Sequence, residues 1–327
     1  MDEKKLYPLK FCALQDDYSW GRERFLLADL GYRDSMVRDG WLAGNLMGEV
    51  MDTYMDRMVG DNVYEYYGRQ FPVCVRHIHA DALMPLRVHP DNETARQRYD
   101  LLGKDKIWYV ERCGRNSRIM LGFREDTDAT EVFRKCNDNT VDSILNTVVP
   151  HQGQFLHIPP GTPHCAGGDI DIVEISQSSP VDICMCGWGE VVSTEEFDPA
   201  LSLVDALDFI DYKAFRSDVP SGNRVELEDF SVERIRLSSV LHSYSGQSDS
   251  PVIYVCISGG AEVRIDVLGQ SAGFAFGGGE LVLVPAECND FRLAPVSADT
   301  MLLEVEVPHI EEKDSYIDPS VPAETGE

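Results

Sequence analysis

Two histidines stand at positions from which their side chains could share one small site. His164 ends the segment GQFLHIPPGTPH (153–164), which has the form G-x5-P-x-G-x2-H. In this pattern a short strand enters a tight turn at Pro159 and Gly161, and the turn delivers the histidine to the end of the strand. His89 lies within LRVHPDNE, directly before an expected helix. Neutral imidazoles are common metal ligands, so the two histidines are candidates for half of a metal site.

The sequence pattern around His164 resembles the second signature motif of the cupins, and LRVHPDNE is the candidate for the first. A cupin fold would bring both histidines to the mouth of a small antiparallel β-barrel, which is a usual place for a small-ligand site. The alternative is that each histidine is a hydrogen-bonded residue of the core.

The segments that must position these residues are mostly short strands. Apolar runs bounded by Gly, Pro, Asn and Asp occur at 72–80, 106–113, 118–123, 153–159, 169–175, 251–257, 261–267, 280–286 and 301–307. Helical spacing is confined to the first two-thirds of the chain, at 46–59, 91–103, 127–136, 140–148 and 199–211. These patterns predict a mainly β protein with helical insertions in its first part.

The histidine motif has a second, partial copy in the last third of the chain. Its Gly, Pro and His positions recur 126 residues later as Gly279, Pro285 and Asp290. The constant offset favours duplication of one barrel unit, although a Gly-strand-Pro pattern also recurs by chance in β proteins. We therefore expect two cupin-like jelly-roll barrels and a tail, namely 1–215 with the helical insertions and the candidate site, 216–307 as a degenerate structural barrel, and 308–327 as an acidic tail.

The charge of the chain limits its partners. Its 327 residues include 29 Lys and Arg against 56 Asp and Glu, a formal net charge of −27. Such a surface repels nucleic acid and anionic membranes, so neither is an expected partner. The sequence has no apolar run of about 18 residues and no secretory leader, and its nine cysteines contain no CxxC pair. A cytoplasmic protein with reduced thiols is therefore expected.

The order of motifs between residues 71 and 190 resembles the type I mannose-6-phosphate isomerases, also called phosphomannose isomerases. The segments that carry the resemblance are FPVCVRHIHADALMPLRVHPDN, GKDKIWYV, LGFREDTDATEVFRKCNDNTVDSILNTVVPHQGQFLHIPPGTPHCAGG, EISQSS and GWGE. With YSWGRERF near the start, the likeness covers about residues 8–305. It implies a cupin fold, a zinc cofactor, and interconversion of mannose 6-phosphate and fructose 6-phosphate through an enediol.

The chain departs from this family at its metal site. The family holds its metal with the Gln and His of QVHP, the Glu of GKTE and the His of the turn, and these positions are Arg87, His89, Lys106 and His164 here. Two ligands are retained, and two are replaced by cations without a lone pair to donate. A family active-site arginine corresponds to Cys184. We therefore expect zinc to bind weakly or not at all.

The retained and substituted cations leave two interpretations open. In the first, Arg87, Lys104 and Lys106 are catalytic residues that supply positive charge without a metal, and Arg87, Lys104 and Glu174 bind the phosphosugar. In the second, Arg87 and Lys106 pair with nearby acids such as Glu174 and fill an inactive site. The sequence predicts a phosphosugar isomerase of this family with an altered metal site and reduced or absent activity. The alternative is a non-catalytic cupin that binds an anionic sugar or a partner protein.

Overall fold

Short strands make up most of the ordered chain. The structure is a computed structural model that describes residues 4–189, 201–216, 222–244, 249–267 and 270–309. Its strands are β1 Phe11–Cys12, β2 Leu14–Tyr18, β3 Gly21–Leu27, β4 Met36–Val37, β5 Val73–Ala80, β6 Leu86–Val88, β7 Lys106–Cys113, β8 Arg118–Phe123, β9 Leu145–Val148, β10 Phe155–Ile158, β11 His164–Gly167, β12 Ile170–Gln177, β13 Ile183–Cys186, β14 Arg224–Glu226, β15 Ser231–Leu237, β16 Leu241–Tyr244, β17 Val252–Ser258, β18 Gly260–Val267, β19 Gln270–Gly277, β20 Leu281–Val284, β21 Asp290–Pro295 and β22 Thr300–Glu306. Its helices are α1 Met47–Val59, α2 Asp61–Tyr67, α3 Asn92–Tyr99, α4 Ala129–Asn137, η1 Val141–Ser143 and α5 Leu203–Ala206. The prediction of a mainly β fold is confirmed.

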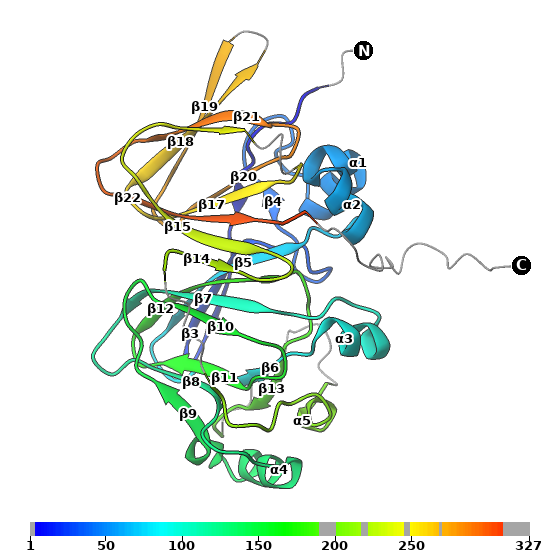
Figure 1. The fold of residues 1–327 in the computed structure, drawn as a ribbon, viewed down its shortest axis with the longest axis vertical. Helices are drawn as coiled ribbons and strands as arrows, with labels where there is room; N and C mark the ends of the chain where they lie inside the picture. The colour runs from blue at the N-terminus through cyan, green and yellow to red at the C-terminus, as the bar shows by residue number, and fades with distance from the viewer. Residues whose placement is uncertain (1–3, 190–200, 217–221, 245–248, 268–269, 310–327) are drawn as a thin grey trace, which may run out of the picture.

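The strands form two β units, one above the other (Figure 1). The lower unit combines the sheets β10-β7-β12-β5-β3-β2 and β13-β6-β11-β8-β9, and the upper unit combines β14-β15-β22-β17-β20 and β16-β21-β18-β19. The order β10-β7-β12-β5 recurs as β20-β17-β22-β15. Gly153 and Gly279, which precede β10 and β20, both have positive φ, at 81° and 77°. These correspondences agree with duplication of one barrel unit.

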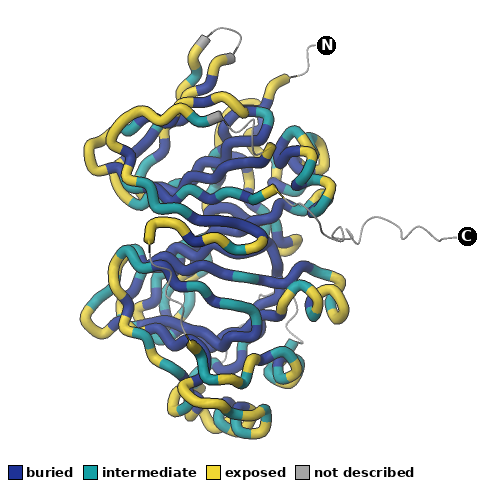
Figure 2. Tube along the Cα trace, in the orientation of Figure 1, coloured by how far each residue is buried: buried dark blue, intermediate teal, exposed yellow. Residues whose placement is uncertain are grey.

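Strand alternation decides which side chains reach the interior of the lower unit. On β7, Ile107 belongs to a core shared with the upper unit, whereas Trp108 belongs to the core of the lower unit. Successive residues of a strand point to opposite faces, so Lys106 shares the inward face with Trp108. Arg76 of β5 and Glu174 of β12 stand directly opposite each other in the neighbouring ladder. The central strands are buried in both units, as Figure 2 shows.

Helices α1 and α2 pack against the upper unit, whereas the sequence predicts helical insertions in the first barrel. Their apolar residues, such as Val50 and Met58, belong to the same buried cluster as Val255 and Leu283 of the upper unit. In Figure 1 both helices lie beside that unit. The chain therefore adds β2 and β3 to the lower unit, packs α1 and α2 against the upper unit, and returns to the lower unit at β5.

The predicted helix at 140–148 is wrong. Only Val141–Ser143 form a 3-10 turn, and Leu145–Val148 form β9, whose Val148 pairs with Ile119 of β8. The β-branched residues of this segment favour a strand once a partner edge is present. The helices predicted at 91–103 and 199–211 are shorter than expected, since α3 ends at Tyr99 and α5 has four residues.

Parts of the expected organisation lie beyond the described chain. Residues 310–327 of the expected acidic tail, and Glu190 of the GWGE segment, fall outside the described residues. None of the described helices has the length and apolar composition needed to cross a membrane.

Candidate functional site

The two predicted histidines meet inside the lower unit. His89 follows β6 and His164 begins β11; both are fully buried, and their ring centroids lie 5.1 Å apart. The turn between β10 and β11 also connects to His89 directly, because the amide of Gly161 donates to the His89 carbonyl at 2.8 Å. Gly161 adopts φ 76°, a conformation that glycine tolerates best. The turn predicted from the Pro-x-Gly pattern thus positions both imidazoles.

The surroundings of His164 define its protonation. Its Nδ1 lies 2.9 Å from the Thr162 carbonyl, which can only accept, so Nδ1 carries the hydrogen. Its Nε2 lies 3.0 Å from Nζ of Lys106 and accepts from that ammonium. Burial, together with the positive charge of Lys106, lowers the pKa of His164 to about 3. His164 is therefore a neutral acceptor for a buried cation.

Lys106 lies at the centre of this site. Its Nζ donates to Oδ2 of Asp182 at 2.6 Å and lies 3.8 Å from Oε2 of Glu174. Burial raises the pKa of Asp182, but the charges of Lys106 and Lys104 outweigh burial and hold that pKa well below its usual range. A fully buried ammonium thus has a carboxylate and an imidazole as direct partners. Asp182, just before β13, is the acid that the sequence-based interpretation missed.

A second group of buried ion pairs adjoins Lys106. Arg76 Nε donates to Glu174 Oε1 at 3.0 Å, and Trp108 Nε1 donates to Glu174 Oε2 at 2.7 Å. Glu23 of β3 accepts from Nη1 of both arginines, at 3.3 Å from Arg76 and 2.8 Å from Arg87. Burial raises the pKa of Glu174, but Arg76 and then Lys106 lower it further than burial raises it. Each of these charges therefore has an opposite charge beside it.

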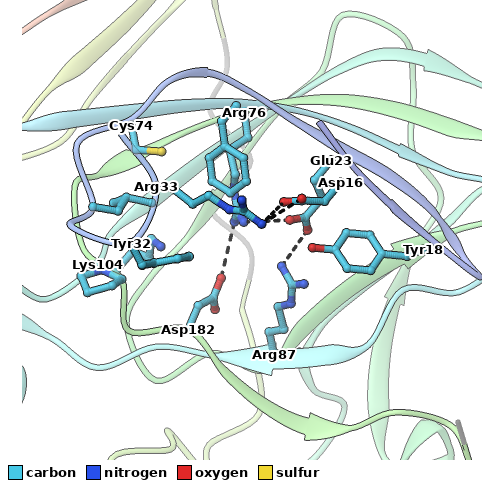
Figure 3. A pocket seen from close by; sticks show the side chains of 13 residues that line it. Asp16, Tyr18, Glu23, Tyr32, Arg33, Cys74, Arg76, Arg87, Lys104 and Asp182 are labelled. Carbon is cyan, nitrogen blue, oxygen red and sulfur yellow. Dashed lines mark hydrogen bonds and ion pairs between the residues drawn. The ribbon is translucent and has the colours of Figure 1, made fainter. Parts of the chain in front are cut away.

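A small pocket opens on one side of this network (Figure 3). Its volume is about 20 Å³, and its lining includes the predicted residues Arg87 and Lys104 together with Arg76, Glu23 and Asp182. Lys106 is not part of the lining. The described lining carries four cations and three acids, completed by Arg33 and Asp16, whose side chains form an ion pair at 2.8 Å.

Lys104 is the cation of the described pocket lining that forms no close ion pair. Its Nζ donates to the carbonyl of Ser179 at 2.7 Å, and it forms no ion pair with any described residue. Burial lowers the pKa of Lys104 to about 8. This ammonium is therefore the cation of the pocket most free to attract an anionic ligand.

The donor atoms present do not fit the family's metal set. Arg87 and Lys106, which the resemblance places at two of the four ligand positions, have no lone pair to offer while charged. A different group, made by His89, His164 and Asp182, has its ligand atoms within 4.8 Å of one another. The Lys106 ammonium already contacts two of these three residues. No step of the chemistry is therefore assigned to a metal.

Three members of the network were not predicted because their partners lie far away in the sequence. Arg76 contacts Glu23, 53 positions away, and Asp182, 106 positions away. One sequence feature could have predicted a buried ion pair, namely a charged residue within an apolar strand, such as Arg76 in the run 72–80. Cys184, which the resemblance aligns with the family's arginine, is half-buried on β13.

Comparisons with known proteins give the same family for several curated relatives. A scan against protein-family models finds no match. Mannose-6-phosphate isomerase ManA of Bacillus subtilis (strain 168) is 26% identical over 191 residues, which is 53% of this chain and 58% of that protein. Mannose-6-phosphate isomerase of Streptococcus mutans is 31% identical over 109 residues, 33% of this chain and 34% of that protein. The matched regions thus span from about a third to just under three-fifths of these relatives.

Solved structures share the fold over nearly the whole chain. The mannose 6-phosphate isomerase of Bacillus subtilis has a TM-score of 0.74 at 17% identity, covering 91% of this chain and 99% of that one. A putative mannosephosphate isomerase of Archaeoglobus fulgidus has a TM-score of 0.73 at 18% identity, covering 93% and 98%. Together with the named relatives, these structures confirm the predicted resemblance and the mainly β, multi-sheet fold.

Proposed function

We propose that this chain, a homologue of the mannose-6-phosphate isomerases, recognises a hexose 6-phosphate in the lower unit but has lost most metal-dependent isomerisation. The names of the relatives support the substrate class, which we take to be mannose 6-phosphate or fructose 6-phosphate. The proposal includes a cytoplasmic location. It also includes a phosphosugar as the small-molecule partner, with no nucleic acid or membrane partner.

The main observation that supports the proposal is the excess of positively charged residues in the pocket lining. Its described lining has one more cation than acids, on a chain whose formal net charge is −27. Lys104 provides the excess charge, and it is buried beside Arg76 and Arg87. A desolvated cation in a concave site attracts a phosphate dianion more strongly than an exposed lysine does. We therefore assign Lys104 and Arg87 to substrate binding, as the sequence predicts.

The same ion pairs support a reduced activity. Aldose–ketose isomerisation moves a proton between C2 and C1, so it needs a base at the sugar carbon and a positive centre for the developing oxyanion. Lys106 is held by Asp182 and His164, and Arg87 is held by Glu23. Such pairing keeps positive charge in the site but lowers the freedom of either group to transfer a proton. We expect slow isomerisation that added zinc does not restore.

The test combines a coupled isomerase assay with calorimetry. We expect mannose 6-phosphate to bind at low salt, with affinity that falls as salt is added, and turnover to be unchanged by zinc. Isomerisation that rises to the rate of an active relative when zinc is added would contradict the loss of metal-dependent activity. Absence of binding for both sugar phosphates at low salt would contradict the recognition of phosphosugars.

A non-catalytic cupin is the second candidate function, and one observation favours it. The pocket volume of about 20 Å³ compares with roughly 300–1,000 Å³ for most small-molecule sites. A hexose phosphate is larger than this volume, so its binding requires lining residues, such as the paired Arg33 and Asp16, to move apart. If neither sugar phosphate binds a correctly folded protein, recognition of another anionic sugar or of a partner protein becomes the better proposal.

A further inference from the structure

We infer that the Lys106 ammonium occupies the position of a metal ion among His89, His164 and Asp182. Without the positive charge of Lys106, these three residues would bind a divalent metal ion. The inference concerns the metal position alone. It does not depend on which sugar the pocket accepts.

The contacts of Lys106 are those of a cation surrounded by donors. Its Nζ lies 2.6 Å from a carboxylate oxygen of Asp182 and 3.0 Å from the Nε2 lone pair of His164, with Glu174 at 3.8 Å. All four side chains are buried. A metal ion would draw on the same carboxylate and imidazole atoms, so the ammonium and a metal cannot share this place.

Other donor atoms of the site remain unused. Both ring nitrogens of His89 and Oδ1 of Asp182 are buried without a hydrogen-bond partner among the described residues. His89 Nδ1 lies 3.9 Å from Asp182 Oδ1, too far for a hydrogen bond. Buried polar atoms without a partner are rare and indicate a bound water or ion. Two of the three candidate metal ligands therefore have buried donor atoms that no hydrogen bond to a described residue occupies.

The size of this donor group suits a small divalent ion after a modest movement. The ligand atoms of His89, His164 and Asp182 lie within 4.8 Å of one another. Ligands of tetrahedral zinc at about 2.0–2.2 Å are about 3.3–3.6 Å apart, so the three groups need to close by up to roughly 1.5 Å. The bond from His164 Nδ1 to the Thr162 carbonyl already orients this ring as a ligand.

The charge of the cluster explains why Lys106 and a metal are alternatives. The buried acids Glu23, Glu174 and Asp182 face one more buried cation than their own number, namely Arg76, Arg87, Lys104 and Lys106. Loss of the Lys106 charge leaves this group balanced and removes the ammonium that repels a divalent ion from His164 and Asp182. Asp182 is not at any ligand position of the family, so this donor set differs from the family's own.

The test measures metal binding to the full chain, with Co²⁺ as the probe. Metal-free wild type and Lys106→Glu are titrated with Co²⁺ while the visible d–d absorption is recorded. We expect one equivalent to bind Lys106→Glu at least about 100-fold more tightly than wild type, without the near-ultraviolet thiolate band that cysteine ligands give. Zinc should displace the cobalt. Adding Asp182→Asn to Lys106→Glu should weaken binding at least about 10-fold.

Two further variants keep the test decisive. Lys106→Gln removes the charge without adding an acid, and it should also bind Co²⁺ more tightly than wild type, even where Lys106→Glu folds poorly. Lys5→Glu makes the same charge change at an exposed position and should bind no better than wild type. Stoichiometric zinc that stays on wild type during dialysis against a chelator would overturn the inference. So would Lys106→Glu and Lys106→Gln proteins that fold normally but bind Co²⁺ no better than wild type.

Discussion

Arg76 and Glu174 face each other in adjacent strands of the lower unit and are joined by their side chains, with Arg76 Nε donating to Glu174 Oε1 at 3.0 Å. Both residues are buried, at 5% and 1% exposure. The guanidinium of Arg76 also contacts Glu23 at 3.3 Å and Asp182 at 3.5 Å. One arginine thus compensates three buried carboxylates.

Arg76→Met should therefore destabilise the protein strongly. Removing one partner of a buried ion pair leaves uncompensated charge, and we expect the free energy of unfolding to fall by about 3–5 kcal/mol. Urea denaturation measures this change. Arg224→Met is the control, because Arg224 forms its ion pairs at the surface and should change stability by less than about 1 kcal/mol. Equal effects of the two substitutions would contradict the prediction.

Gly161→Ala should disturb the turn that connects the two histidines. Gly161 has φ 76°, and an added Cβ would lie 2.6 Å from the carbonyl oxygen of Phe209. We expect a loss of more than about 2 kcal/mol, measured by thermal unfolding. Gly31→Ala is a matched control, since Gly31 has φ 79° with no atom within 4 Å of an added Cβ. Gly31→Ala should lower the free energy of unfolding by only about 1 kcal/mol. An equally small loss for Gly161→Ala would contradict a clash with Phe209.

Asp29→Asn should change how stability depends on pH. Burial, with the charges of Asp34 and Asp52, raises the pKa of Asp29 to about 7. The folded protein therefore holds a proton that the unfolded chain releases near pH 4, and the stability this proton provides is lost as the pH rises through about 7.

Relative to Asp29→Asn, wild type should lose about 1–2 kcal/mol of stability between pH 5 and pH 8, after allowance for partial exposure of Asp29. Asparagine keeps an oxygen that can accept from the Phe71 amide, as Asp29 does at 2.9 Å. Urea denaturation of both proteins at several pH values gives the difference. A difference that stays constant with pH, or that changes in the opposite direction, would refute the assignment.

Binding of mannose 6-phosphate should weaken as the pH rises through about 8. Burial lowers the pKa of Lys104 to about 8, so its ammonium is lost there while the phosphate keeps its charge. We expect Lys104→Met to bind at least about 10-fold more weakly at pH 7 and to lack this pH dependence. Calorimetry at low salt measures both. Lys5→Met serves as the control, and a Lys104→Met protein with the wild-type pH profile would exclude this role for Lys104.

The turn and the strand that hold His164 were predictable from the sequence, because both depend on residues that are close together in the chain. The Pro159-x-Gly161 turn and the strand preceding it required only turn chemistry and strand alternation. The strand predicted at 106–113 matches β7 in both bounds. The family resemblance predicts Arg87 and Lys106 as substituted ligand positions, and the structure places both residues in the buried network around His164.

The partners of these cations were not predictable in the same way. Arg87 pairs with Glu23, 64 positions earlier, and Lys106 pairs with Asp182, 76 positions later. Such pairs depend on which strands become neighbours, which no local pattern records. The same reason explains the error at 140–148, where β8 supplies the edge that makes this segment a strand.

The packing of the N-terminal segment against the upper unit has a consequence for how the chain is made. Leu9 and Leu283 exchange backbone hydrogen bonds at 2.8 and 2.9 Å, and helix α1 buries Val50 among residues of the last third of the chain. Synthesis runs from the N-terminus, so these early residues leave the ribosome long before their partners exist. Their apolar side chains cannot reach their native partners until the final strands are translated. Completion of the upper unit is therefore a late event in the folding of the nascent chain.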